Sequence, residues 1–124
     1  MIPYDKKSGK IWYNNELVDW ADAKIHILNH GLHYASCVFE GERVYENSIF
    51  KLEEHTSRLF YSAKRMGMTI PYTEEEINDA CKEIISSLIK SFKTLFKLCF
   101  VIFSFLSSSE IVIPLYIESR CNTL

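Results

Sequence analysis

The sequence predicts one α+β domain in which a small antiparallel sheet packs against two helices. Three observations favour this class. The chain has 124 residues, enough for one ordinary domain, and 48% of them are hydrophobic, enough for one core. Short apolar runs separated by turn residues come first, and apolar residues at helical spacing follow them. Strands and helices in separate blocks are typical of α+β proteins.

Two β-hairpins are predicted before the helices. Residues 11–18 read IWY, then Asn14 and Asn15, then ELV, and asparagine tolerates the left-handed backbone that a tight turn needs. A second hairpin is expected over residues 38–50, with its turn at residues 46–47.

Two helices are predicted from apolar spacing and from terminal signals. The first covers residues 52–66, and Gly67 is a plausible C-cap because glycine adopts positive φ without strain. The second begins after Thr73, which forms a capping box with Glu76, and continues to Leu88.

Charge and cysteine content narrow the function classes. The 14 Lys and Arg residues oppose 16 Asp and Glu residues, which is too balanced for the electrostatic footprint of a nucleic-acid-binding protein. The 4 cysteines are widely spaced with no CxxC pair, and the N-terminus has no apolar secretion signal. We therefore expect a reduced, cytoplasmic protein with no nucleic-acid partner.

Composition changes near residue 88. Residues 88–124 contain no glycine and are rich in Phe, Ile, Leu and Ser. The run LCFVIFSFL at 98–106 favours a buried strand pair or an aggregation-prone tail. Lys97 and the serine run leave it too short and broken for a membrane span. We expect a domain over residues 1–87, followed by a divergent apolar tail over residues 88–124.

The segment from His26 to Arg43 carries the candidate chemistry. A zinc site is one hypothesis. Histidine and cysteine are zinc ligands, and a continuous helix would place four of them on one face: His26, His30, His33 and Cys37. Gly31 makes that helix doubtful, and loop histidines bonded to backbone carbonyls are the alternative. No metal site is therefore assigned.

A second hypothesis is a cysteine phosphatase loop, since Cys37 and Arg43 have the required spacing. The residues between them argue against it, because Glu40 and Glu42 would repel a phosphate dianion.

The same segment resembles a known family. His30-Gly-Leu-His-Tyr34, then Val38-Phe-Glu-Gly41-x-Arg43, then HTSRL ending at Leu59, resembles the N-terminal domain of class IV pyridoxal-phosphate aminotransferases, specifically the branched-chain amino acid aminotransferases. The resemblance covers roughly the first 86 residues. It implies the small domain of that fold and a pyridoxal phosphate cofactor.

The resemblance also implies residue roles. Arg58 matches the arginine that binds the cofactor phosphate, although a solvated helix arginine paired with Glu54 is the alternative. Three residues match the wall of the pocket for an aliphatic side chain, with ordinary core packing as the alternative: Tyr34, Phe39 and Gly41. Arg43 matches a position near the substrate carboxylate.

The sequence departs from the family after Leu88. The family expects a Gly-Tyr-x-Arg-Pro strand after the Thr73 helix, and its Schiff-base lysine belongs to a second, C-terminal domain. We find neither, so no catalytic lysine is assigned, and we expect a truncated chain whose tail is translated out of frame.

The resemblance implies transfer of an amino group from Leu, Ile or Val to 2-oxoglutarate, and we expect this chain to be inactive alone. Three alternatives remain open: a non-catalytic module that forms a homo-oligomer or docks with a full-length paralogue, the metal-binding domain above, and a chain with no stable fold.

Overall fold

The computed structural model describes residues 3, 6, 9–45, 48–91, 99–106 and 110–116, with side chains up to residue 87. Within these residues it contains the six strands β1 Lys10–Tyr13, β2 Glu16–Asp19, β3 Cys37–Tyr45, β4 Ser48–Ile49, β5 Cys99–Leu106 and β6 Glu110–Tyr116. The helices are α1 His30–Tyr34, α2 Leu52–Arg65 and α3 Glu74–Ser91. The predicted α+β class is confirmed, with the short α1 as an addition.

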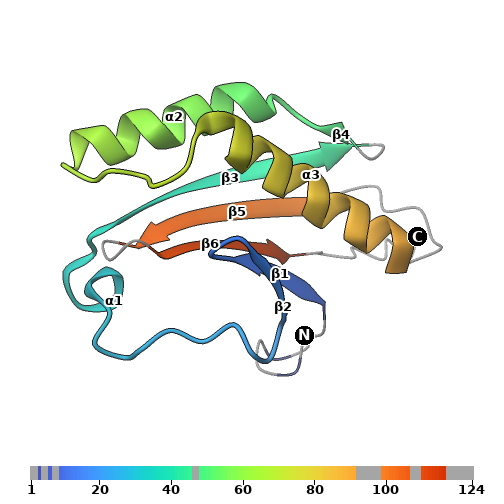
Figure 1. Cartoon of the computed structure of the whole chain (residues 1–124), viewed down its shortest axis with the longest axis horizontal. Helices are drawn as coiled ribbons and strands as arrows, with labels where there is room; N and C mark the ends of the chain where they lie inside the picture. The colour runs from blue at the N-terminus through green and yellow to red at the C-terminus, as the bar shows by residue number, and fades with distance from the viewer. Residues whose placement is uncertain are drawn as a thin grey trace, which may run out of the picture.

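The described strands form one antiparallel sheet in the order β2-β1-β6-β5-β3-β4 (Figure 1). The last two of these strands in the sequence lie in its centre. β5 pairs along nearly the whole of β3, with Gly41 opposite Ile102, and β6 pairs with β1, with Trp12 opposite Ile113. The strand pair predicted after residue 98 is therefore present, and it joins the two predicted hairpins into one sheet.

The strands of both predicted hairpins pair, and the turn of the first is the predicted one. β1 and β2 are joined through Asn14 and Asn15, whose φ angles of 47° and 71° lie in the left-handed region. This is the backbone that a two-residue turn requires to match the twist of its strands. β3 and β4 pair through Val44 and Ile49, and the expected turn at residues 46–47 lies outside the described residues.

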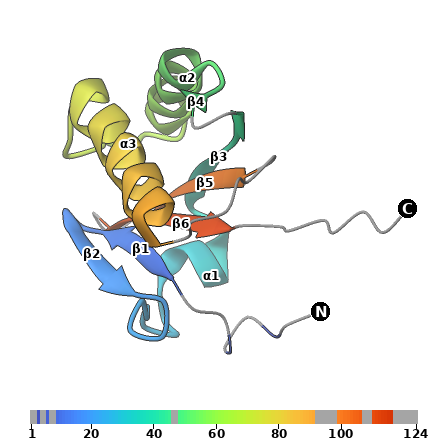
Figure 2. The ribbon, with the colours of Figure 1, turned by 90° about the vertical axis from the view of Figure 1, so that its right-hand side faces the viewer.

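Helices α2 and α3 cover one side of the sheet, while α1 lies on the other side (Figure 2). The core forms between the sheet and these two helices, and it includes Trp12 from β1 and Val44 from β3. Leu59 of α2 is 1% exposed, and Ile77 and Ile84 of α3 are fully buried. Burial of such side chains is the main stabilising contribution to a domain of this size.

The helix ends follow the local chemistry of the sequence. The hydroxyl of Thr73 accepts a hydrogen bond from the Glu76 N–H at 3.2 Å, and the Glu76 carboxylate accepts one from the Thr73 N–H at 2.7 Å. This reciprocal pair is the predicted capping box. α2 ends before Gly67, whose φ of 71° confirms the predicted glycine at the helix end.

Helix α1 is the element that the sequence did not predict. Its N-cap is Asn29, whose side-chain oxygen accepts a hydrogen bond from the Gly31 N–H at 2.7 Å. The helix spans 5 residues and buries none of them, so it has no apolar stripe to reveal it. None of the helices in the described residues is long and apolar enough to cross a bilayer.

Candidate functional site

Strand β3 presents two different faces because successive side chains point to opposite sides of a sheet. The side chains that point toward α2 and α3 are buried: Val38, Glu40, Glu42 and Val44. Phe39, Gly41 and Arg43 lie on the opposite face, where Phe39 is 70% exposed. Three of the predicted site residues are therefore brought together on the sheet face that α2 and α3 leave open.

The open face has room for a ligand beside β3. A methyl group built at Gly41 would meet no atom within 4 Å, so a ligand can approach this part of the backbone closely. The guanidinium of Arg43 donates to the hydroxyl of Tyr45 at 3.5 Å. The core-packing alternative is wrong for Phe39, because a core side chain would not be so exposed.

Arg58 lies on the other side of the sheet, on α2. Its Nε donates to Oε1 of Glu40 at 2.6 Å and its Nη2 donates to Oε2, so the two groups form a bidentate pair. Nδ1 of His55 lies 2.9 Å from Oε2 of the same carboxylate. The Glu40 side chain is 5% exposed, whereas that of Arg58 is 63% exposed.

The charges in this cluster compensate one another. Burial acts to raise the pKa of Glu40, but the hydrogen bonds from Arg58 and His55 outweigh it, and its pKa lies below the usual range. The same carboxylate raises the pKa of Arg58. Glu40 therefore stays ionised and holds one edge of the guanidinium in place.

The alternative partner for Arg58 is wrong. Glu54, four residues earlier on α2, lies 3.7 Å from the ammonium of Lys51 instead. Sequence reasoning missed Glu40 and His55, and treated Glu40 as a charge that repels phosphate. Alternation along β3 could have found it, because it places Glu40 on the buried face, where a carboxylate that stays ionised needs a cationic partner.

Tyr34 ends α1 and is 74% exposed. Its ring makes an edge contact with His30, with the centroids 5.2 Å apart. Tyr34 lies on this short helix rather than on β3, which carries Phe39, Gly41 and Arg43. Its exposure also contradicts the core-packing alternative.

The metal and phosphatase hypotheses are not supported. Nε2 of His33 bonds the Ile27 carbonyl at 2.7 Å, which is the backbone bond that the alternative expected, although His33 lies in α1 and not in a loop. The described residues contain no cluster of three or more His, Cys, Asp or Glu that could hold a metal. Cys37 and Arg43 lie on one extended strand, about 20 Å apart at the usual rise per residue. They cannot form a phosphate loop.

Glu42 is a further buried acid that sequence reasoning did not single out as a buried group. It is fully buried, and within the described part of the chain neither of its carboxylate oxygens has a hydrogen-bond partner. Burial, with smaller effects from Glu40 and Glu53, raises its pKa to about 8. This carboxyl is therefore mainly protonated at neutral pH.

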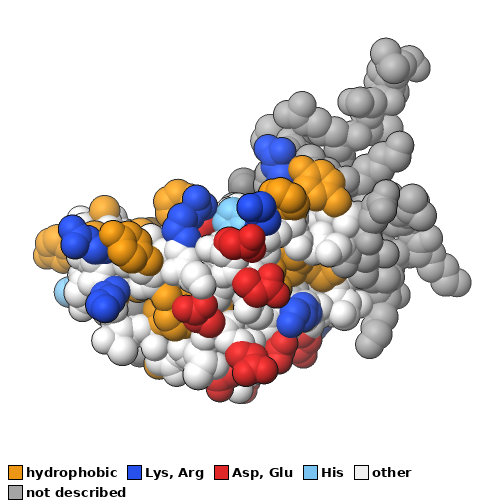
Figure 3. All heavy atoms as spheres, turned by 90° about the horizontal axis from the view of Figure 1, so that it is seen from above, with side chains coloured by type: hydrophobic (Ala, Val, Ile, Leu, Met, Phe, Trp, Pro, Cys, Tyr) orange, Lys and Arg blue, Asp and Glu red, His pale blue; other side chains and the backbone are white. Residues whose placement is uncertain are grey.

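The surface over α2 and α3 carries charges of both signs. Seen from the helix side, acidic and basic side chains are interspersed along these two helices (Figure 3). The acidic ones include the first turn of α3, where carboxylates interact favourably with the helix dipole. The environment of Arg58 itself is set by its bonds to Glu40, which also contacts His55.

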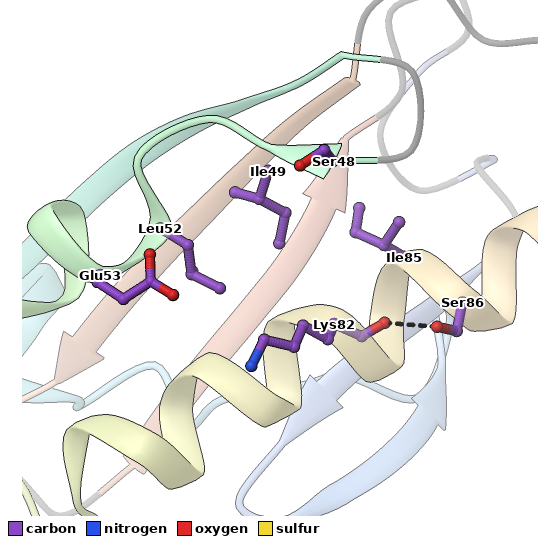
Figure 4. Close-up of a pocket in the computed structure, with 7 residues that line it drawn as sticks. All are labelled: Ser48, Ile49, Leu52, Glu53, Lys82, Ile85 and Ser86. Atoms are coloured by element: carbon purple, nitrogen blue, oxygen red, sulfur yellow. Dashed lines mark hydrogen bonds between the residues drawn. The ribbon is translucent and has the colours of Figure 1, made fainter.

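A pocket of about 320 Å³ lies between β4, the start of α2 and α3 (Figure 4). Ile49, Leu52 and Ile85 form its apolar lining, and Glu53 and Lys82 lie at its sides. Lys82 is paired with Asp79 at 3.0 Å. None of the predicted site residues lines this pocket, so it is separate from the candidate site.

Comparison with known proteins gives a consistent result. The branched-chain-amino-acid aminotransferase of Pseudomonas aeruginosa is 49% identical over 83 residues, which cover 64% of this chain and 27% of that protein. The chain spans 26% to 30% of the length of the curated relatives that it matches.

Solved structures resemble the chain over a longer stretch. The branched-chain aminotransferase of the archaeon Thermoproteus uzoniensis, solved with norvaline, superimposes with a TM-score of 0.76 at 30% identity, over 89% of this chain and 41% of that one. The Escherichia coli enzyme gives a TM-score of 0.76 at 26% identity, over 90% of this chain and 40% of that one.

The match to the family continues past residue 88. The model of the family described as amino-transferase class IV matches residues 37–101, which include β3, both long helices and the start of β5. A strand, β5, does follow the Thr73 helix, and it lacks the Gly-Tyr-x-Arg-Pro sequence. With its motif on β3 and α2 and its sheet shared with solved branched-chain aminotransferases, the chain belongs to the class IV aminotransferase family.

Proposed function

We propose that this chain forms one wall of a pyridoxal-phosphate-dependent branched-chain aminotransferase site. The observation that carries the proposal is the geometry of Arg58. Glu40 occupies one edge of its guanidinium, and the side chain is otherwise 63% exposed. The remaining N–H groups are available for the bidentate hydrogen bonds that a phosphate accepts.

In this assignment Arg58 holds the phosphate of the cofactor. When bound, pyridoxal phosphate supplies an electron sink for the α-carbon of the amino acid. The chain contributes binding and orientation, because Arg58 fixes the phosphate end of the cofactor while the reacting end is left free to meet the substrate.

The open face of β3 is proposed to receive the substrate, which would reach the cofactor around the edge of β3, because within the described residues β4 pairs only with Val44 and Tyr45. The exposed ring of Phe39 offers an apolar surface for an aliphatic side chain, and Gly41 lets that side chain approach the backbone. Arg43 supplies a positive charge for the substrate carboxylate. These three residues support an amino acid of the branched-chain type and the corresponding 2-oxo acid as substrates.

A partner is proposed to cover the surface near α1. The loop before α1 and the helix itself expose several large apolar side chains, namely Ile25, Ile27, Leu28, Leu32 and Tyr34. Such a patch favours protein association. We propose that this patch pairs with a second copy of the chain or with a full-length paralogue.

Transamination also needs the lysine that holds the cofactor. We propose that this lysine comes from a further segment, on this chain or on another, and that the chain is inactive without it. The proposed location is the cytoplasm, because the cysteines Cys37 and Cys81 are both free.

The test compares binding of pyridoxamine 5'-phosphate and pyridoxamine to the 124-residue chain by NMR titration. We expect the phosphorylated ligand to bind more tightly, and Arg58→Gln to weaken its binding by about tenfold, as loss of a charge-assisted hydrogen bond predicts. Arg65→Gln, at the exposed end of α2, is the matched control. Equal loss in both variants, or none, contradicts the proposal.

A further inference from the structure

The further inference concerns the buried acid beside Arg58. The guanidinium has five N–H groups in one plane, and Glu40 takes one from Nε and one from Nη2. A bidentate pair fixes the plane as well as the position of a guanidinium, which a single hydrogen bond does not. The edge that carries Nη1 and the second Nη2 hydrogen is therefore held in one orientation.

The position of Glu40 is itself fixed. It lies on the buried face of β3, between Val38 and Glu42, and its side chain is 5% exposed. His55, one turn before Arg58 on α2, contacts Oε2 at 2.9 Å. Nδ1 of His55 donates to this oxygen. Nδ1 also lies 3.4 Å from Nη2 of Arg58, but both atoms are donors, so this contact is not a hydrogen bond.

We propose that Glu40, supported by His55, is a positioning residue that holds Arg58 in the orientation that binds a phosphate ester. This inference rests on the proposed function, in which Arg58 contacts the cofactor phosphate. Glu40 itself does not contact the phosphate. It acts through Arg58, which without it is a long side chain with many rotamers on an exposed helix surface.

Simple electrostatics predicts the opposite effect for this acid. A carboxylate close to a phosphate site repels the phosphate. If this repulsion were the only effect, removal of the carboxylate would strengthen phosphate binding. If Glu40 positions Arg58, its removal weakens binding although a negative charge is lost. The sign of the change therefore separates the two effects.

The experiment measures the affinity of the 124-residue chain for pyridoxamine 5'-phosphate and for pyridoxamine by NMR titration. We expect Glu40→Gln to weaken binding of the phosphorylated ligand by about threefold to tenfold, since the loss of one ordered charged contact falls in this range. Binding of pyridoxamine stays unchanged. Glu54→Gln is the matched control. It also removes one negative charge near Arg58, but from α2, and the Glu54 carboxylate lies beside Lys51 and not beside Arg58.

The outcomes separate the inference from the proposed function. If Arg58→Gln has no effect on the phosphorylated ligand, the proposed function is wrong. If Arg58→Gln weakens binding while Glu40→Gln leaves it unchanged or strengthens it, the positioning role is overturned and Glu40 serves only the fold.

A measurement on the unaltered chain covers the case in which Glu40→Gln does not fold. The Nε–H signal of Arg58 is expected to exchange slowly with solvent, because Glu40 accepts this hydrogen. It should stay protected when pyridoxamine 5'-phosphate is added. Rapid exchange in the free chain, or loss of protection on binding, would show that Glu40 does not hold the guanidinium and would overturn the inference.

Discussion

The buried carboxyl of Glu42 makes the stability of this chain depend on pH in an unusual direction. Its pKa rises from an ordinary 4.5 to about 8 in the folded state, because burial disfavours the charged form. Between these two values the unfolded chain loses a proton that the folded chain keeps. The free energy of unfolding therefore falls as pH rises, by about 1.4 kcal/mol per pH unit, and levels off above the folded pKa.

The variant Glu42→Gln removes this ionisation with little change of shape. Its amide is also buried without a partner, so the variant and the unaltered chain should have similar stability near pH 5. Near pH 8.5 the unaltered chain has lost this stabilisation and the variant has not. The variant should then be more stable than the unaltered chain, and the difference between them should have changed by about 4 kcal/mol since pH 5, because of the pKa shift between the two states. Urea unfolding at both pH values measures the two differences.

Glu83→Gln is the control for this experiment, because it removes an exposed carboxylate from α3 and leaves Glu42 in place. Its stability should follow the same fall with pH as that of the unaltered chain. Parallel pH profiles for Glu42→Gln and the unaltered chain would refute the reasoning, since they would show that Glu42 ionises equally in the folded and unfolded states.

Three further predictions concern the core, the capping box and the tail. Leu59→Ala should lower the free energy of unfolding by about 2 to 5 kcal/mol in urea titration, because the side chain is 1% exposed and its removal leaves a cavity between α2 and the sheet; a change below about 1 kcal/mol would contradict this packing. Thr73→Ala should cost about 1 kcal/mol through loss of the N-cap, while Thr73→Ser, which keeps the hydroxyl, should cost less; equal losses would mean that the cap does not act through its oxygen. Translation of the DNA downstream of codon 87 in the other two frames should give a Gly-Tyr-x-Arg-Pro strand if the tail is out of frame, and the absence of that strand from both frames would exclude this origin.

Local chemistry was sufficient to predict the elements whose signals lie within a few residues. The Asn14-Asn15 turn, the Thr73 capping box and the end of α2 before Gly67 each depend on neighbours in sequence, and each is present. Helix α1 was missed because it is short and buries no side chain.

The position of the last described strands could not be predicted. An apolar run without clear period identifies a buried segment but not its partners, and β5 and β6 pair with strands far away in the sequence. The bond between Arg58 and Glu40 was hidden for a related reason. A helix places Glu54 beside Arg58, whereas only the packing of α2 on β3 brings Glu40 there.

The order of the strands also affects how this chain can fold. The first and second hairpins are made early in synthesis, yet they are not neighbours in the sheet, because β5 and β6 lie between them. Until the ribosome has released the chain as far as β6, β1 and β3 each keep an unpaired edge. Contacts between distant parts of a sequence form slowly, and unpaired edges invite intermolecular pairing in the meantime. Placing β5 and β6 at the centre therefore lengthens the time during which the edges of β1 and β3 are open to pairing with other chains.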